Sequence, residues 1–198
     1  MAEEIRKPSN GPTKLEEVTI APELPEAFLA EAKQEGATVV AYAPDQLAAF
    51  IQGQITLGDL EGIDKEAQYQ MAEKGYQLIE EGKLDDGKIV FEGLLALDPF
   101  DAYFLTALGS IAQRTEQFDE ADHFYSRALE INPFSIAAWA HRGETRIHKG
   151  LLLEAAEDLT KAIDLDPKGE DPIALRARMV AQTVADKLRV AQSKQDED

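Results

Sequence analysis

A short motif of an acidic or amide residue followed by proline recurs every 34 residues, as Asp98-Pro99, Asn132-Pro133 and Asp166-Pro167. Three glycines keep the same interval, namely Gly75, Gly109 and Gly143. A fixed period of this length is typical of proteins that stack copies of one small unit, because each copy buries its apolar face only against its neighbours. Proline cannot continue the interior of a helix, so we expect each unit to end at its proline.

Each unit follows the pattern of the tetratricopeptide repeat, which consists of two helices joined by a short turn. The large apolar position near the start is Met71, Leu105 and Trp139, and the small position in the second helix is Gly87, Ala121 and Ala155. Four residues after each small position comes a large apolar residue on the same helix face, namely Phe91, Tyr125 and Leu159. We therefore predict an all-α fold, a tetratricopeptide-repeat superhelix of three repeats over residues 68–101, 102–135 and 136–169.

The segments on either side of the repeats differ from them in composition. Residues 1–25 contain four prolines and several acidic residues without apolar periodicity, which predicts a disordered arm. Residues 26–67 carry apolar residues at helical spacing and are expected to form an N-terminal helical extension. A stack of repeats requires a helix that covers its last open face, and 170–190 fits a capping helix of this kind. Residues 191–198 are expected to be an acidic, solvated tail.

Charge and composition exclude several classes of function. The chain has 38 acidic and 20 basic side chains and a net charge of −18, which repels nucleic acids and anionic membranes. It has no cysteine, and its start, MAEEIRKPSN, does not resemble a secretory signal, so we expect a cytoplasmic protein. No spacing of residues indicates an enzyme, a cofactor or a metal site. The three histidines are interpreted as surface or packing residues: His123, His141 and His148.

The concave surface of a tetratricopeptide superhelix is lined by fixed positions of the first helix of each repeat, and ligands of such proteins commonly lie there as peptides. These positions are aromatic, aliphatic or small in this chain, which favours a ligand with apolar side chains. Ala72 and Tyr76 also stand where the two-carboxylate clamp of other members has Lys and Asn, which argues against an acidic C-terminus as ligand. Each single tyrosine is as well explained by packing as by ligand contact. The candidate groove residues are Tyr69, Ala72, Tyr76, Ile79, Tyr103, Thr106, Ser110, Gln113, Ala137, Ala140, Glu144 and Ile147.

Repeat three carries Arg142 and Arg146 at two positions that are usually apolar. The two arginines are four residues apart and therefore share one helix face. We expect them to pair with acidic residues of the preceding repeat, such as Asp119 or Asp122, in a polar contact between repeats or between protomers. An anion-binding role is the alternative.

The segment TLGDL precedes the first repeat, and the junction DPFDAYFLTALG joins the first two repeats. With these motifs, residues 50–180 resemble the class II chaperones of type III secretion systems. The resemblance implies a cytoplasmic homodimer that binds hydrophobic translocator proteins before secretion and holds a short extended segment of each in the groove. By position, it implies peptide pockets at Tyr69, Tyr76, Tyr103 and Ala137. It further implies dimer contacts from the helical extension, at Leu47, Phe50, Ile51, Leu57 and Leu60.

A general tetratricopeptide adaptor in a multiprotein assembly is the alternative function. The two functions differ in how the partner is bound. A chaperone meets its client unfolded and releases it, whereas an adaptor stays in a stoichiometric complex with the same partner.

Overall fold

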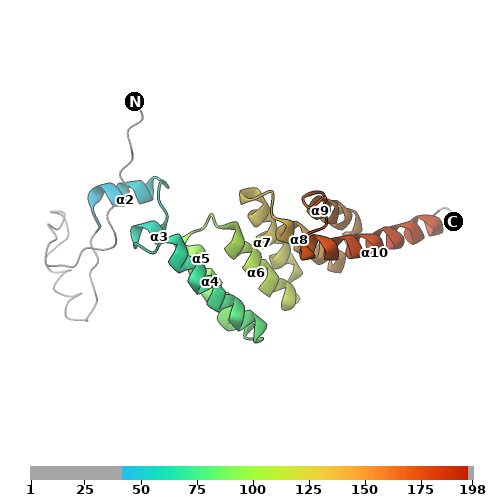
Figure 1. The fold of residues 1–198 in the computed structure, drawn as a ribbon, viewed down its shortest axis with the longest axis horizontal. Coiled ribbons are helices and arrows are strands. Elements are labelled where there is room, and N and C mark those ends of the chain that lie inside the picture. The colour runs from blue at the N-terminus through green and yellow to red at the C-terminus, as the bar shows by residue number, and fades with distance from the viewer. Residues whose placement is uncertain (1–41, 196–198) are drawn as a thin grey trace, which may run out of the picture. The chain divides into compact units, whose positions relative to one another are not determined.

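The computed structural model describes residues 42–195, so the predicted arm 1–25 and the beginning of the predicted extension 26–67 lie outside the described residues. Every regular element between residues 42 and 195 is a helix, and the predicted all-α fold is confirmed (Figure 1). The helices are α2 (Pro44–Ile51), α3 (Leu57–Leu60), α4 (Lys65–Glu80), α5 (Leu84–Leu97), α6 (Ala102–Arg114), α7 (Phe118–Ile131), α8 (Ile136–His148), α9 (Leu152–Asp164) and α10 (Pro172–Gln195). Within this part of the chain, none of the helices combines the length and apolar character needed to cross a membrane.

The described chain divides into two compact units, and the first comprises residues up to Gln70 together with Ala96–Pro99. Thr56 begins α3 with a reciprocal cap, in which its hydroxyl accepts from the Asp59 amide at 3.1 Å and the Asp59 carboxylate accepts from the Thr56 amide at 2.9 Å. Gly58 packs against the buried Gln68, whose amide nitrogen would lie 2.5 Å from an added Cβ. The TLGDL segment is therefore a capped turn of helix in which Gly58 leaves room for the buried side chain of Gln68.

The second unit comprises Met71–Leu95 and the chain from Phe100 onward. In it α6 packs on α7, α8 packs on α7 and α9, and α10 packs on α8 and α9 (Figure 1). A short polar side chain begins each new layer of helices: Asp101 accepts from the amides of Tyr103 and Phe104, Ser135 from Ala138, and Asp171 from Ile173 and Ala174. These caps fix where each helix begins after the proline turn.

The periodic glycines allow the two helices of each pair to approach closely. A Cβ added to any of them would collide with the large residue of the second helix, so only glycine permits the observed contact. The pairs are Gly75 with Phe91 at 2.8 Å, Gly109 with Tyr125 at 2.6 Å, and Gly143 with Leu159 at 2.9 Å. The repeated glycine and the repeated large apolar residue therefore contact each other in every repeat.

Helix α10 covers the last pair of helices, at the position where a capping helix was expected. Ala174, Ala177 and Val184 are buried on it, and the last two pack in one cluster with Leu159 and Ala162 of α9. The helix continues to Gln195, beyond the end predicted at residue 190. The first residues of the predicted tail 191–198 are therefore helical.

An ionic network joins α7, α8 and α9. Arg146 pairs with Asp122 at 3.1 Å, as expected from the sequence, but Arg142 pairs with Asp158 of its own repeat through two hydrogen bonds of 2.8 and 2.9 Å. Asp158 is 2% exposed and also accepts from Arg146 at 2.8 Å. Lys149 extends the network to Asp119 and Asp122. Both arginines are thus engaged by carboxylates of the same chain, Arg142 within repeat three and Arg146 also across to repeat two, which argues against anion binding.

Candidate ligand-binding groove

A cavity of about 390 Å³ lies in the second unit and is lined by residues of α4, α6, α8 and α10 and of the α7–α8 turn. We call it the apolar pocket, because most of the surface that it exposes is apolar. No lysine, arginine, aspartate or glutamate is among the described residues of its wall. These residues are Tyr76, Ala102, Tyr103, Thr106, Ser110, Asn132, Ser135, Ala137, His141 and Ile173.

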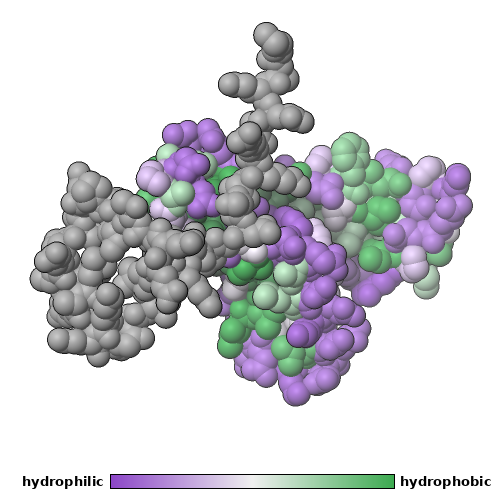
Figure 2. Space-filling model, turned by 60° about the vertical axis from the view of Figure 1, so that its left-hand side comes forward, coloured by the Kyte–Doolittle hydropathy of each residue, from purple (hydrophilic) through white to green (hydrophobic). Residues whose placement is uncertain are grey.

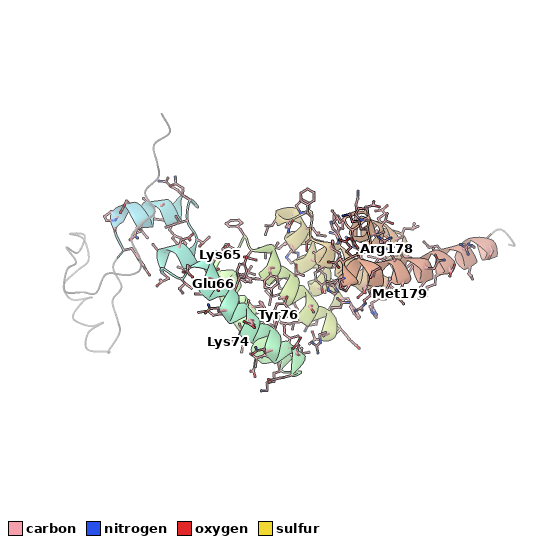
Figure 3. The ribbon with its side chains drawn as sticks, in the orientation of Figure 1. Lys65, Glu66, Lys74, Tyr76, Arg178 and Met179 are labelled. Carbon is pink, nitrogen blue, oxygen red and sulfur yellow. The ribbon has the colours of Figure 1, made fainter. Side chains whose placement is uncertain are left out.

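Two tyrosines form the aromatic wall of the apolar pocket. Tyr76 projects from α4 beside α6, with its ring 5.4 Å from that of Tyr103 and edge-on to Phe91 at 5.1 Å (Figure 3). Burial raises the pKa of both phenols, and the neighbouring Tyr103 raises that of Tyr76 further. Both groups are therefore neutral near pH 7. Tyr103 remains 46% exposed, so its ring is accessible to a ligand.

A second cavity of about 580 Å³, the polar pocket, adjoins the first. The two share Ser110 and His141, and we refer to them together as the groove. The other residues of the polar pocket are Gln113, Arg114, Glu116, Phe118, Glu144, His148 and Arg176.

Glu144 is the buried acid of the polar pocket, with 8% of its surface exposed. Arg176 of α10 pairs with both of its oxygens, at 2.8 and 2.9 Å, and His141 Nδ1 lies 3.9 Å away. Burial alone would raise the pKa of Glu144, but the nearby His141 and the charge of Arg176 outweigh it, so that the pKa lies below its usual value. Glu144 is therefore ionised at neutral pH and holds Arg176 against the groove.

The structure brings together part of the predicted groove. Tyr76, Tyr103, Thr106, Ser110 and Ala137 line the apolar pocket, and Ser110, Gln113 and Glu144 line the polar one. Ala72, Ile79 and Ala140 are at most 4% exposed and serve as packing residues, and Ile147 packs against the core of the last repeat. Tyr69 is 45% exposed and belongs to the first unit.

Several groove residues lie outside the predicted set. Ile173 and Arg176 come from α10, Asn132 and Ser135 from the α7–α8 turn, and His141 from the middle of α8. The fixed ligand-facing positions of a repeat include neither its turns nor a capping helix. His141 was interpreted as a surface or packing residue, and the sequence contained no signal that it lines both pockets.

The predicted dimer-interface residues are unequally exposed. Leu47, Phe50 and Ile51 of α2 are 44%, 37% and 75% exposed, Leu57 is half-buried, and Leu60 is buried in its own chain at 4%. Large apolar side chains such as Ile89 and Leu153 are exposed elsewhere too, and Figure 2 shows hydrophobic areas of surface between hydrophilic ones. Across residues 42–195, no group of three or more histidines or acids is placed to hold a metal ion.

Comparison with known proteins identifies the repeats first. The family model of the tetratricopeptide repeat matches residues 102–135 and 136–168, which coincide with the second and third predicted repeats to within one residue. Residues 102–168 are therefore two tetratricopeptide repeats. Its relatives include the low calcium response locus protein H of Yersinia pestis, which is 28% identical over 143 residues, or 72% of this chain and 85% of that protein.

Solved structures agree with this relationship. The type III secretion translocator chaperone SycD of Yersinia enterocolitica is 27% identical, with a TM-score of 0.60 over 65% of this chain and 97% of SycD. SycD in complex with a peptide of the translocator YopD is 26% identical, with a TM-score of 0.56 over 63% of this chain and 97% of that one. The predicted resemblance to type III secretion chaperones is confirmed.

A larger repeat protein matches a shorter part of this chain. RNA polymerase II-associated protein 3 of Xenopus laevis is 29% identical over 104 residues, which is 52% of this chain but 16% of that protein. The similarity to the secretion chaperones thus covers more of both chains than the similarity to this larger repeat protein.

Proposed function

We propose that this protein is a cytoplasmic chaperone that holds a short apolar segment of a hydrophobic type III secretion translocator in its groove. The observation that carries the proposal is the apolar pocket, which is uncharged, open to solvent and lined by Tyr76, Tyr103 and Ala137. Aromatic and small side chains together provide contact area and space for the side chains of an extended peptide.

The relatives support this assignment. SycD is a translocator chaperone and has been crystallised with a peptide of the translocator YopD. The similarity extends over almost the whole of SycD, so it includes the region around the repeats as well as the repeats themselves.

The mechanism that follows is binding without chemistry. A protein that inserts into membranes exposes apolar segments that aggregate or insert too early in the cell that makes it. Occupation of the apolar pocket removes one such segment from water, and the net charge of −18 keeps the complex dispersed. Since the client must later be released, the affinity is expected to be moderate.

A capture experiment tests the proposal. Tagged wild-type protein and a Tyr76→Ala/Tyr103→Ala variant would be used to recover partners from the native cytoplasm, with identification by mass spectrometry and circular dichroism to establish folding. Wild type should recover a hydrophobic, membrane-inserting protein, and the variant should recover less than about a tenth as much, because truncation of central aromatic anchors costs one to several kcal/mol each.

The matched control is Ile89→Ser/Leu153→Ser, which changes two side chains that are 67% and 66% exposed outside the groove. It should recover the client as wild type does. Recovery of one soluble assembly in equal amount by wild type and the groove variant would reject the chaperone function and leave the adaptor.

We also propose that the chain forms a homodimer through the apolar face of α2. Leu47, Phe50 and Ile51 lie on one short helix and are all exposed, although apolar clusters of this kind are usually covered in stable proteins. A further structure of SycD, 26% identical and with a TM-score of 0.58, describes an alternative dimer of that chaperone.

A further inference from the structure

The two halves of the groove differ in charge. The described wall of the apolar pocket contains no charged group, whereas the polar pocket contains two arginines and two glutamates. Because the pockets share Ser110 and His141, a peptide that lies in the apolar pocket can continue directly into the polar one. The polar pocket is therefore positioned to recognise a neighbouring side chain of the same segment.

Helix α10 contributes to both halves. Ile173 lines the apolar pocket and Arg176 lines the polar pocket, and residues three apart on a helix are neighbours on one face. The helix that covers the last repeat is thus also a wall of the groove. A ligand that spans both pockets contacts it twice.

The charges of the polar pocket are not equally available to a ligand. Glu144 is 8% exposed, and its two carboxylate oxygens accept hydrogen bonds from Nε and Nη2 of Arg176. The side chain of Arg176 is 65% exposed, and its Nη1 is left to donate to another acceptor. Arg114 is also exposed and uses one nitrogen to donate to the Ile79 carbonyl at 2.9 Å. A ligand therefore meets two guanidinium groups, opposed by the exposed Glu116, before it meets Glu144.

We propose that the polar pocket is a subsite for an acidic side chain of the bound client segment, with Arg176 and Arg114 as its specificity-determining residues. The inference rests on the proposed function of the groove. Guanidinium groups bind carboxylates through paired, charge-assisted hydrogen bonds, whereas a lysine of the client would face the guanidinium of Arg176 first. Since the whole chain carries a charge of −18, the preference acts at contact distance and not through long-range attraction.

Binding of synthetic peptides tests the subsite. The probe is a positional library of short peptides, acetylated and amidated at their ends, in which an apolar sequence is kept and one position at a time is Glu, Gln or Lys. Fluorescence anisotropy gives the affinity of each pool for the full chain. At one position, Glu should bind roughly tenfold more tightly than Gln or Lys, and the difference should shrink as salt is added.

Two variants assign the preference to the arginines. Glu144→Gln/Arg176→Gln removes both charges of this ion pair, so no unpaired buried carboxylate is left to destabilise the fold. Arg114→Gln leaves the pair intact. Each should lower the preference for Glu over Gln while the Gln pools bind as before. Arg189→Gln is the matched control on α10, because Arg189 is 75% exposed, pairs with Asp186 and does not line the groove.

The outcomes separate this inference from the function on which it rests. Equal binding of the Glu and Gln pools by wild type would overturn the acidic subsite and leave the peptide-binding function standing. An unchanged preference in both arginine variants would overturn the assignment of the residues. If no pool binds, the proposed peptide groove is itself rejected.

Discussion

Gly109 shows how one atom sets the distance between two helices. Its Cα faces the ring of Tyr125, which is fully buried and donates through its hydroxyl to Gln113 at 2.9 Å. Gln113 lines the polar pocket, so the contact between glycine and tyrosine also positions a residue of the groove. The packing of the helices and the geometry of the groove are therefore linked at this point.

Gly109→Ala should destabilise the protein, because the new Cβ would lie 2.6 Å from the Tyr125 ring and the helices would have to separate. The free energy of unfolding, measured with urea, should fall by about 1–3 kcal/mol. Gly93→Ala is the control, since a Cβ there meets nothing within 4 Å, and alanine should raise the free energy of unfolding by roughly 0.5–1 kcal/mol. Equal effects of the two substitutions would contradict the packing argument.

Groove residues that occupy a repeated position of the periodic unit could be predicted from the sequence, whereas groove residues outside the repeats could not. Tyr76, Tyr103 and Ala137 were placed in the groove because they occupy fixed positions of a periodic unit. Ile173 and Arg176 have no periodic counterpart, and their role depends on how α10 packs. Asp158 was missed as the partner of Arg142, because the expected partners were in the preceding repeat and not in the second helix of the same one.

The junction of α7 with α8 and α9 is held by charges as well as by apolar contacts. The carboxylate of Asp122 on α7 forms ion pairs with Arg146, near the end of α8, and with Lys149, which follows α8. The N–O distances are 3.1 and 3.0 Å. Burial of Asp122 would raise its pKa, but Lys149 and Arg146 together lower it below the ordinary value of 3.8. A carboxylate with a lowered pKa stabilises the folded state when the pH is above the unfolded pKa, and this stabilisation is lost as the pH falls through the folded pKa.

We therefore expect Asp122→Asn to lower the urea midpoint of unfolding at pH 7. We also expect the variant to lose less stability than wild type as the pH falls below about 4. Urea titrations at several pH values measure both effects. Glu130→Gln removes an exposed carboxylate from the same helix and should leave the pH dependence close to that of wild type. An Asp122→Asn profile parallel to wild type in the acid range would show that the ion pair does not couple folding to protonation.

The positions of the helices along the chain were predicted more accurately than the residues at which the helices end. The proline turns and glycine positions determine where each pair of helices lies along the chain, and the caps at Asp101 and Ser135 agree with those turns. The end of α10 was placed too early, because the residues after Val190 are polar and a polar segment can be either an exposed helix or a coil.

For the whole molecule, the α2 surface predicts the assembly state. Sedimentation equilibrium of the full chain should give twice the mass of one chain, and Leu47→Glu/Phe50→Glu/Ile51→Glu should give a single chain, because charges placed in an apolar interface must lose their hydration. Ile89→Glu/Leu153→Glu should remain dimeric. A wild-type chain that sediments as a monomer at all concentrations would exclude the dimer, and a dimeric α2 variant would move the contact to another surface.

Ser110 and His141 belong to the walls of both pockets, so the two halves of the groove are not independent receptors. A fragment bound in one half fixes the shared side chains for the other and changes the affinity that a second fragment finds there. By linkage this coupling is reciprocal. We therefore expect the affinity of each half-segment to change when the other half of the groove is occupied, and titrating one half-segment in the presence of the other measures this coupling.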